Sequence, residues 1–171
     1  MAGNKYLADI NGRLSEVSSN QSSAGAGDAG KIPALDSGGK LDTSFLPTGI
    51  GAETFSVVAS EALSAGNFVN LWNNAGTINV RKADATAAGK EADGFVLSAF
   101  SSSATASVYM AGINNALTGL TPGSYYFLDT TAGGINTTAP SASGNVVQSI
   151  GRAEATTSIA FQPDGRGWVK A

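Results

Sequence analysis

The clearest hydrophobic and polar pattern in this chain covers residues 104–110. Ala, Val and Met side chains occupy every second position there, and Thr, Ser and Tyr lie between them. This period of two predicts a half-buried β-strand, because successive side chains of a strand point to opposite faces. Segments of similar character follow one another from residue 53 onward. The predicted strands are residues 53–60, 67–72, 77–82, 94–101, 104–111, 113–117, 124–128, 134–138, 145–152 and 157–162.

Turn signals separate these predicted strands. Pro122 fixes φ for the second position of a turn, and Gly123 supplies the positive φ that a type II turn needs at its third position. Residues 73–76 (Asn-Asn-Ala-Gly) predict a hairpin loop, and residues 83–91 a longer exposed loop. Short strands at this spacing are typical of a small antiparallel β-sandwich or barrel, so the predicted fold class is all-β.

The N-terminal segment has a different period. Leu7, Ile10, Leu14 and Val17 are spaced three, four and three residues apart, which predicts a short amphipathic helix within residues 1–20. Gly12 in its middle costs about 1 kcal/mol relative to Ala. A helix this short is marginal in water and needs a partner surface. The alternative is a frayed N-terminal tail.

Residues 18–30 form a low-complexity linker, and their last six residues match the pattern G-x-G-x-x-G. A dinucleotide-binding fingerprint requires a strand before this pattern and a helix that begins within it, so that the helix N-terminus receives the pyrophosphate. Here a Ser/Asn/Gln run precedes the glycines, and Lys31-Ile32-Pro33 follows them. The context therefore argues against a nucleotide site.

Residues 31–50 are predicted to be an extended arm. Pro33, Pro47 and the Gly38-Gly39 pair prevent a single regular element. We expect the apolar side chains of such a segment to lie along a surface that another protein provides. The predicted anchor residues are Leu7, Ile10, Leu14, Ile32, Leu35, Leu41, Phe45 and Leu46. The predicted division is an anchoring region, residues 1–52, and a β-domain, residues 53–171.

Composition narrows the function classes. Charged residues make up 13% of the chain and the net charge is −3, with no basic cluster beyond Arg81-Lys82, so no nucleic-acid partner is expected. The absence of Cys and His removes disulfides, thiolate and imidazole metal sites, and Cys or His catalysis. No apolar run approaches the roughly 18 residues of a membrane helix, and no signal-peptide core is visible, so no membrane partner is expected.

Carboxylates are the remaining candidates for catalysis, and the 13 Asp and Glu residues are scattered without a glycosidase pattern. Asp93 and Asp129 are typical turn residues, and no D-x-D-x-D-G calcium loop is present. Tyr125, Tyr126 and Phe127 offer a sugar-binding platform, but alternation sends Tyr126 to the opposite face from the other two, which favours core packing on at least one face. We therefore expect no enzymatic activity, no cofactor and no metal.

Residues 30–47 read G-K-I-P-A-L-D-S-G-G-K-L-D-T-S-F-L-P. This stretch resembles the G-K-[IVL]-P-x-L-D-x-x-G-K-L-D-x-S-x-L-P segment of many tailed-phage fibre and head-appendage proteins. The later chain resembles small β-domains of phage head-decoration and fibre proteins, through AGNFV (65–69), DGFV (93–96), GLTPG (119–123) and AGGI (132–135). The resemblance implies a structural virion protein that is assembled in a bacterial cytoplasm and forms a homotrimer.

Three functions from different classes agree with these features. The first is a phage capsid-decoration (cement or head-fibre) subunit that binds the major capsid protein through residues 1–50 and projects its β-domain. The second is a receptor-binding or adaptor piece of a tail fibre, which the lack of repetitive shaft sequence disfavours. The third is a carbohydrate-binding β-module. Three copies that share the N-terminal stripe and the arm would stabilise segments too small to be stable alone, in agreement with a trimer.

Overall fold

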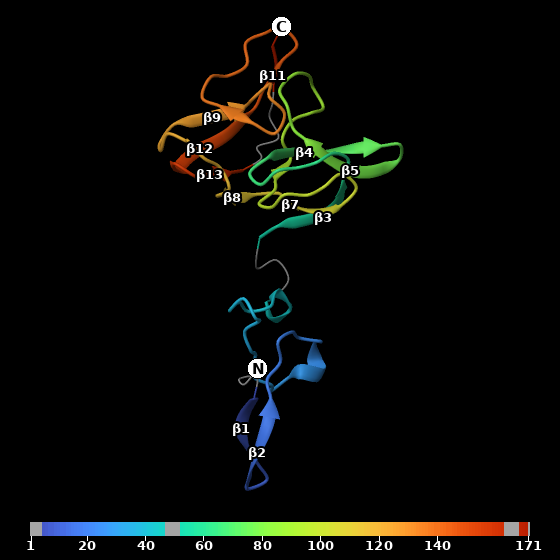
Figure 1. Ribbon diagram of the computed structural model, residues 1–171, viewed down its shortest axis with the longest axis vertical. Helices are drawn as coiled ribbons and strands as arrows, with labels where there is room; N and C mark the ends of the chain where they lie inside the picture. The colour runs from blue at the N-terminus through green and yellow to red at the C-terminus, as the bar shows by residue number, and fades with distance from the viewer. Residues whose placement is uncertain (1–4, 47–51, 163–167, 171) are drawn as a thin grey trace. The chain divides into compact units, whose positions relative to one another are not determined.

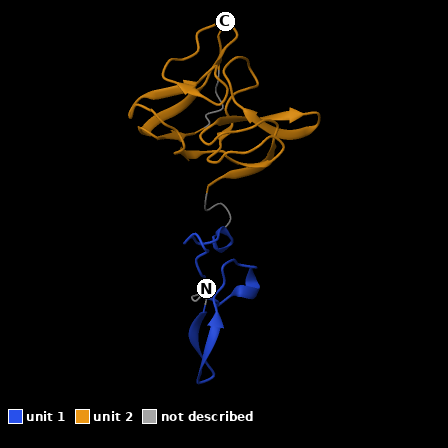
Figure 2. Cartoon of the chain, in the orientation of Figure 1, with its two compact units in different colours: residues 1–51 blue, residues 52–171 orange. Residues whose placement is uncertain are grey.

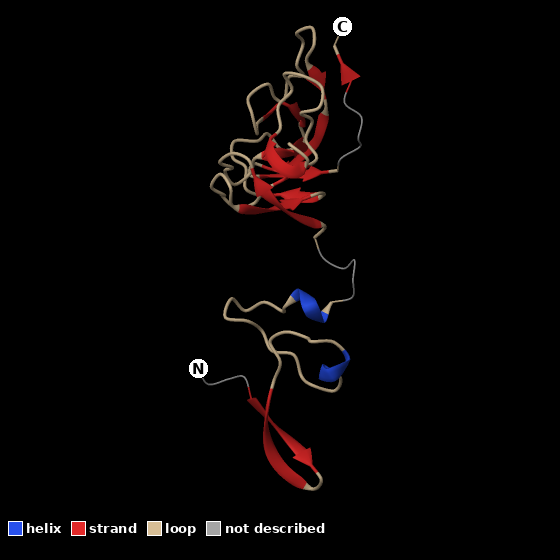
Figure 3. Cartoon of the chain, turned by 90° about the vertical axis from the view of Figure 1, so that its right-hand side faces the viewer, coloured by secondary structure: helices blue, strands red, loops and turns tan. Residues whose placement is uncertain are grey.

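The computed structural model describes residues 5–46, 52–162 and 168–170 and divides the chain into two compact units, residues 1–51 and residues 52–171 (Figure 2). Strands make up most of the regular structure in both units (Figure 3). The helical elements of the described part are two three-residue 3-10 turns, η1 (Ala26–Asp28) and η2 (Thr43–Phe45). The predicted all-β character is therefore confirmed, whereas the predicted N-terminal helix is absent from the described residues.

The prediction of a helix within residues 1–20 is wrong because the segment forms a hairpin. Strands β1 (Lys5–Ile10) and β2 (Arg13–Ser18) pair antiparallel, in blue in Figure 1. The loop between them is Asn11-Gly12, with φ angles of 56° and 79°. A two-residue loop with positive φ at both positions is a type I′ turn, whose twist matches that of paired strands, and Asn-Gly is its strongest sequence signal. This turn preference outweighs the helical spacing, since a helix would carry Gly12 in its interior.

In residues 19–46, short turns are held by side chains. Asp28 Oδ2 accepts a hydrogen bond from the backbone N–H of Ala24 at 2.6 Å, and Asp42 Oδ1 accepts one from that of Ser44 at 2.9 Å. Each carboxylate satisfies an N–H group of a short turn that has no helix to continue into. Residues 25–30 thus contain a single 3-10 turn, with neither the preceding strand nor the following helix that a dinucleotide fingerprint requires.

Unit 2 begins with a closed five-stranded barrel. Its strands are β3 (Thr54–Ala59), β4 (Phe68–Asn74), β5 (Thr77–Lys82), β6 (Gly94–Phe95) and β7 (Thr105–Tyr109), and they pair in the order β3-β5-β4-β6-β7 (Figure 1). All pairs are antiparallel except β3 and β5, which are parallel. The closed order leaves no free edge within this group of strands.

A five-stranded antiparallel sheet completes the main body of unit 2. It contains β8 (Gly112–Asn114), β9 (Tyr125–Leu128), β10 (Ile135–Asn136), β12 (Ser149–Ala155) and β13 (Ser158–Phe161), in the order β10-β9-β12-β13-β8. A further antiparallel pair joins β11 (Val146–Val147) to β14 (Trp168–Val169). The predicted strand over residues 145–152 is thus divided between β11 and β12, which pair with different partners.

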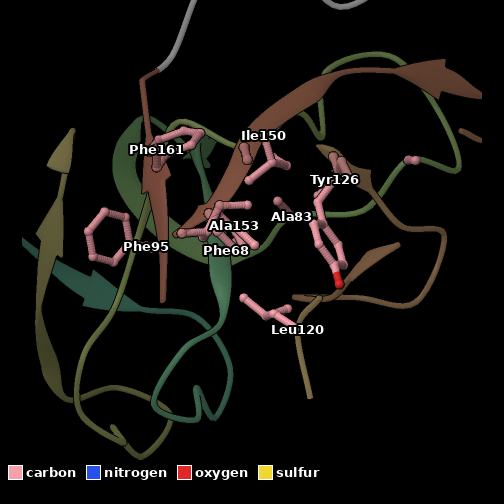
Figure 4. Packing of buried hydrophobic residues seen from close by; sticks show 12 residues of the cluster. Phe68, Ala83, Phe95, Leu120, Tyr126, Ile150, Ala153 and Phe161 are labelled. Atoms are coloured by element: carbon pink, nitrogen blue, oxygen red, sulfur yellow. The ribbon is translucent and has the colours of Figure 1, made fainter. Parts of the chain in front are cut away.

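Two hydrophobic clusters fill unit 2. One lies among the barrel strands and includes Val57, Val80 and Val108. The other joins barrel residues to the five-stranded sheet (Figure 4). At its centre the ring centroids of Phe68 and Phe161 are 5.5 Å apart, in an edge-to-face arrangement that aromatic pairs prefer. Every described residue of both clusters follows residue 56 in the chain.

Candidate attachment surface

The predicted anchor residues are exposed on unit 1. None of residues 5–46 is buried. The exposed fraction is largest for Leu14, at 76%, and is 69% for Leu7. We define the attachment surface as the eight predicted residues, of which seven are exposed and Phe45 is partly buried: Leu7, Ile10, Leu14, Ile32, Leu35, Leu41, Phe45 and Leu46. Contiguous exposed apolar side chains are typical of interaction surfaces.

The hairpin presents apolar residues on both faces. Leu7 lies opposite Glu16 and Leu14 lies opposite Asp9, which places the two leucines on the same face. Ile10 points to the other face, because side chains alternate along a strand. A helix would have put all three residues on one stripe, so the structure divides this part of the predicted anchor. A two-stranded hairpin of this kind is marginal alone in water and gains stability when another layer covers a face.

Hydrogen bonds link the segments that carry the other predicted anchor residues. Asn20 N–H donates to the carbonyl of Ile32 at 3.0 Å, and Ala34 N–H donates to the carbonyl of Asn20 at 2.7 Å. The backbone N–H of Ser23 donates to Ser44 Oγ at 2.7 Å. The segments that carry Ile32 and the η2 turn are therefore both attached to residues 20–23. The unit arranges its apolar side chains in space without burying them.

The charges of unit 1 are nearly balanced. Residues 5–46 contain four Lys or Arg and five Asp or Glu. Lys5 pairs with Glu16 across the hairpin, and Lys31 Nζ lies 2.7 Å from Asp28 Oδ1. The hydrogen bond from Lys31, together with that from the Ala24 N–H, lowers the pKa of Asp28 to about 2. Paired and nearly balanced charges give little long-range electrostatic steering.

A polar cluster on the barrel has a structural use. Arg81 Nε donates to Asn70 Oδ1 at 2.9 Å, and its Nη2 donates to the carbonyl of Gly89 at 2.8 Å. Asn70 Nδ2 in turn donates to the carbonyl of Glu91 at 2.8 Å and to Asp93 Oδ2 at 3.1 Å. Burial raises the pKa of Asp93. These bonds tie the loop after β5 to strands β4 and β5, and the polar side chain of Asn70 finds its partners on that loop and on β5.

The alternation predicted for the aromatic run is confirmed. Tyr126 is 6% exposed and lies in the core (Figure 4), and its hydroxyl accepts a hydrogen bond from the backbone N–H of Thr121 at 2.9 Å. Tyr125 is 62% exposed on the other face of β9, where Phe127 is partly buried. Tyr125 lies opposite Arg152, which lines a depression together with Gln162. Sequence reasoning did not single out these two residues, because only strand pairing sets Arg152 opposite Tyr125 and brings Arg152 and Gln162 to one depression.

Within the described ranges, no group of three Asp, Glu, His or Cys residues is placed to hold a metal ion. In the same ranges, no helix combines the length and the apolar character needed to cross a membrane. The chain matches no protein-family model and no curated protein.

Proposed function

We propose that this chain is a structural virion protein, a capsid-decoration subunit that binds the major capsid protein through the attachment surface and displays unit 2. The observation that carries the proposal is the contrast between the two units. Unit 2 has a complete buried core, whereas unit 1 has ordered turns, exposed apolar side chains and no buried residue in its described part. The resemblance of residues 30–47 to a segment of phage virion proteins supports the same assignment.

The energetics favour attachment through several of these side chains together. Burying one large apolar side chain contributes about 1.5–3 kcal/mol. Three or four of them together reach the size of the association cost, about 4–15 kcal/mol. The hydrogen bonds that already fix the arm reduce the further ordering cost. A homotrimer would add avidity without new contacts, and the second apolar face of the hairpin gives the copies a surface on which to pack.

The test is the double variant Phe45→Ala with Leu46→Ala. We expect phage particles to lose this variant while its melting temperature stays that of the wild type, because both side chains lie outside the unit 2 core. The matched control is Val58→Ala with Ile78→Ala, which removes two exposed apolar side chains from unit 2, at 40% and 50% exposure. Full occupancy of the first variant, together with release of the second, would show that attachment uses unit 2.

A further inference from the structure

The outer face of the five-stranded sheet contains a depression of about 290 Å³. Strands β12 and β13 form it, and its lining residues are Ser149, Ile150, Gly151, Arg152, Ala160 and Gln162. Gly151 and Ala160 have the smallest side chains among these residues, so they form the floor of the depression, and the longer side chains of Arg152 and Gln162 form its walls. Within the described residues, the side chains of Ser149 and Gln162 make no hydrogen bond, and both are free to contact a ligand.

A break in the strand register creates this floor. The pairing of β12 with β9 shifts between Ser149 and Gly151. Gly151 has a φ of 148°, and a Cβ atom there would lie 2.1 Å from the carbonyl oxygen of Ala160. Glycine is therefore required where the two backbones approach most closely. Register breaks of this kind re-aim neighbouring side chains and are common beside binding sites.

Arg152 is held in place beside the depression. Its Nε donates to the carbonyl of Gly123 at 2.7 Å, and its guanidinium carbon lies 5.9 Å from the centre of the Tyr125 ring. No carboxylate of the described residues pairs with it, although Glu154 follows two positions along the strand. The outer guanidinium nitrogens thus form a positively charged fork, held by the hydrogen bond to Gly123 and without a counter-charge among the described residues.

We propose that this depression binds an acidic saccharide, a sugar unit that carries a carboxylate. The guanidinium fork matches the two oxygens of a carboxylate. The exposed Tyr125 ring offers an apolar edge for the C–H groups of a sugar, and Ser149 and Gln162 supply a hydroxyl and an amide for its hydroxyl groups. A phosphate or sulfate alone would use the fork but not the ring, the hydroxyl or the amide. The inference concerns unit 2 and does not depend on attachment through unit 1.

The experiment is an NMR titration of the full chain with trigalacturonate, followed through backbone amides. We expect shifts at Gly151, Arg152, Ala160 and Gln162 and a dissociation constant of roughly 1–10 mM, since the depression is shallow. Arg152→Gln should weaken binding about tenfold, because a charge-assisted pair is lost. Arg13→Gln makes the same charge change on the hairpin of unit 1 and should leave binding unchanged within about twofold.

A second variant separates a lost fold from a lost site. Ala160→Leu fills the depression and leaves Arg152 in place, and it should also abolish the shifts while the rest of the spectrum is preserved. The proposal is overturned by an absence of shifts at about 20 mM saccharide, by equal binding of Arg152→Gln, or by equal binding of the neutral methyl ester. Inorganic sulfate acting as well as the saccharide would show an adventitious ion only. Shifts that depend on protein concentration without saccharide would assign the face to contacts between copies.

Discussion

Replacement of Gly151 by Ala tests the strand pairing on which unit 2 depends. Gly151 lies in β12 opposite Phe161 of β13 and Tyr126 of β9, at the centre of the five-stranded sheet. Its φ of 148° is one that side-chain-bearing residues rarely adopt, and the added Cβ would lie 2.1 Å from the Ala160 carbonyl oxygen. An ordinary contact begins at 3.4 Å, so the two strands must separate by more than 1 Å or the residue must rotate.

The expected loss of stability follows from these two effects. Overpacking that moves backbone costs about 1–3 kcal/mol. A strained φ adds about 1–2 kcal/mol. Gly151→Ala should therefore lower the free energy of unfolding by about 2–5 kcal/mol, a large share of the roughly 5–15 kcal/mol typical of a whole domain. The neighbouring pairs Arg152 with Ala160 and Ala153 with Ile159 transmit the displacement along both strands.

Urea unfolding followed by far-ultraviolet circular dichroism measures this loss. The matched control is Gly144→Ala, since Gly144 has a φ of 85° and no atom within 4 Å of an added Cβ. The control should lose only the strain contribution of about 1–2 kcal/mol. If the two variants unfold at the same urea concentration, the backbones of β12 and β13 do not approach each other closely at Gly151.

Two further predictions concern the units and a buried carboxylate. A chain that lacks residues 1–30 should keep its β spectrum and a melting temperature within about 4 °C of the full chain, because both cores lie after residue 56; a random-coil spectrum contradicts this. Burial raises the pKa of Asp93 in the folded state above its ordinary value of 3.8. Between 3.8 and the raised pKa the folded state therefore binds more protons than the unfolded state, and the free energy of unfolding falls as pH rises through this window. Asp93→Asn keeps an acceptor for the Leu71 N–H, which lies 2.7 Å from the carboxylate oxygen in the wild type. The variant should therefore lose this pH dependence and unfold at an equal or higher urea concentration at neutral pH. A variant that is less stable by more than about 1 kcal/mol at neutral pH contradicts the reasoning.

Local sequence patterns determined much of unit 2. The alternation over residues 104–110 became β7, with Ala106 and Val108 buried and Thr105 and Ser107 exposed. The same period placed Tyr126 in the core and Tyr125 outside. These predictions hold because a strand has a fixed side-chain period, and the burial of one face is already written in the order of apolar residues.

The N-terminal segment shows where a spacing alone is ambiguous. Apolar residues three and four apart fit one face of a helix, and they fit two short strands equally well when a turn lies between them. The Asn11-Gly12 pair decides between the two, since it favours a type I′ turn and disfavours a helix interior. The sequence contained the deciding signal in two residues, but the division of Leu7 and Ile10 between opposite faces follows only from the observed register.

Long-range pairing was decided by the tertiary structure alone. The parallel contact of β3 with β5, the closure of the barrel and the division of residues 145–152 between two sheets depend on partners far apart in the chain. The same pairing places Tyr125 opposite Arg152 and brings Arg152 and Gln162 to one depression. A strand's own sequence specifies which of its faces is buried, but its neighbour is chosen by competition among all available strands to fill a common core, and that choice positions the side chains of the candidate saccharide site.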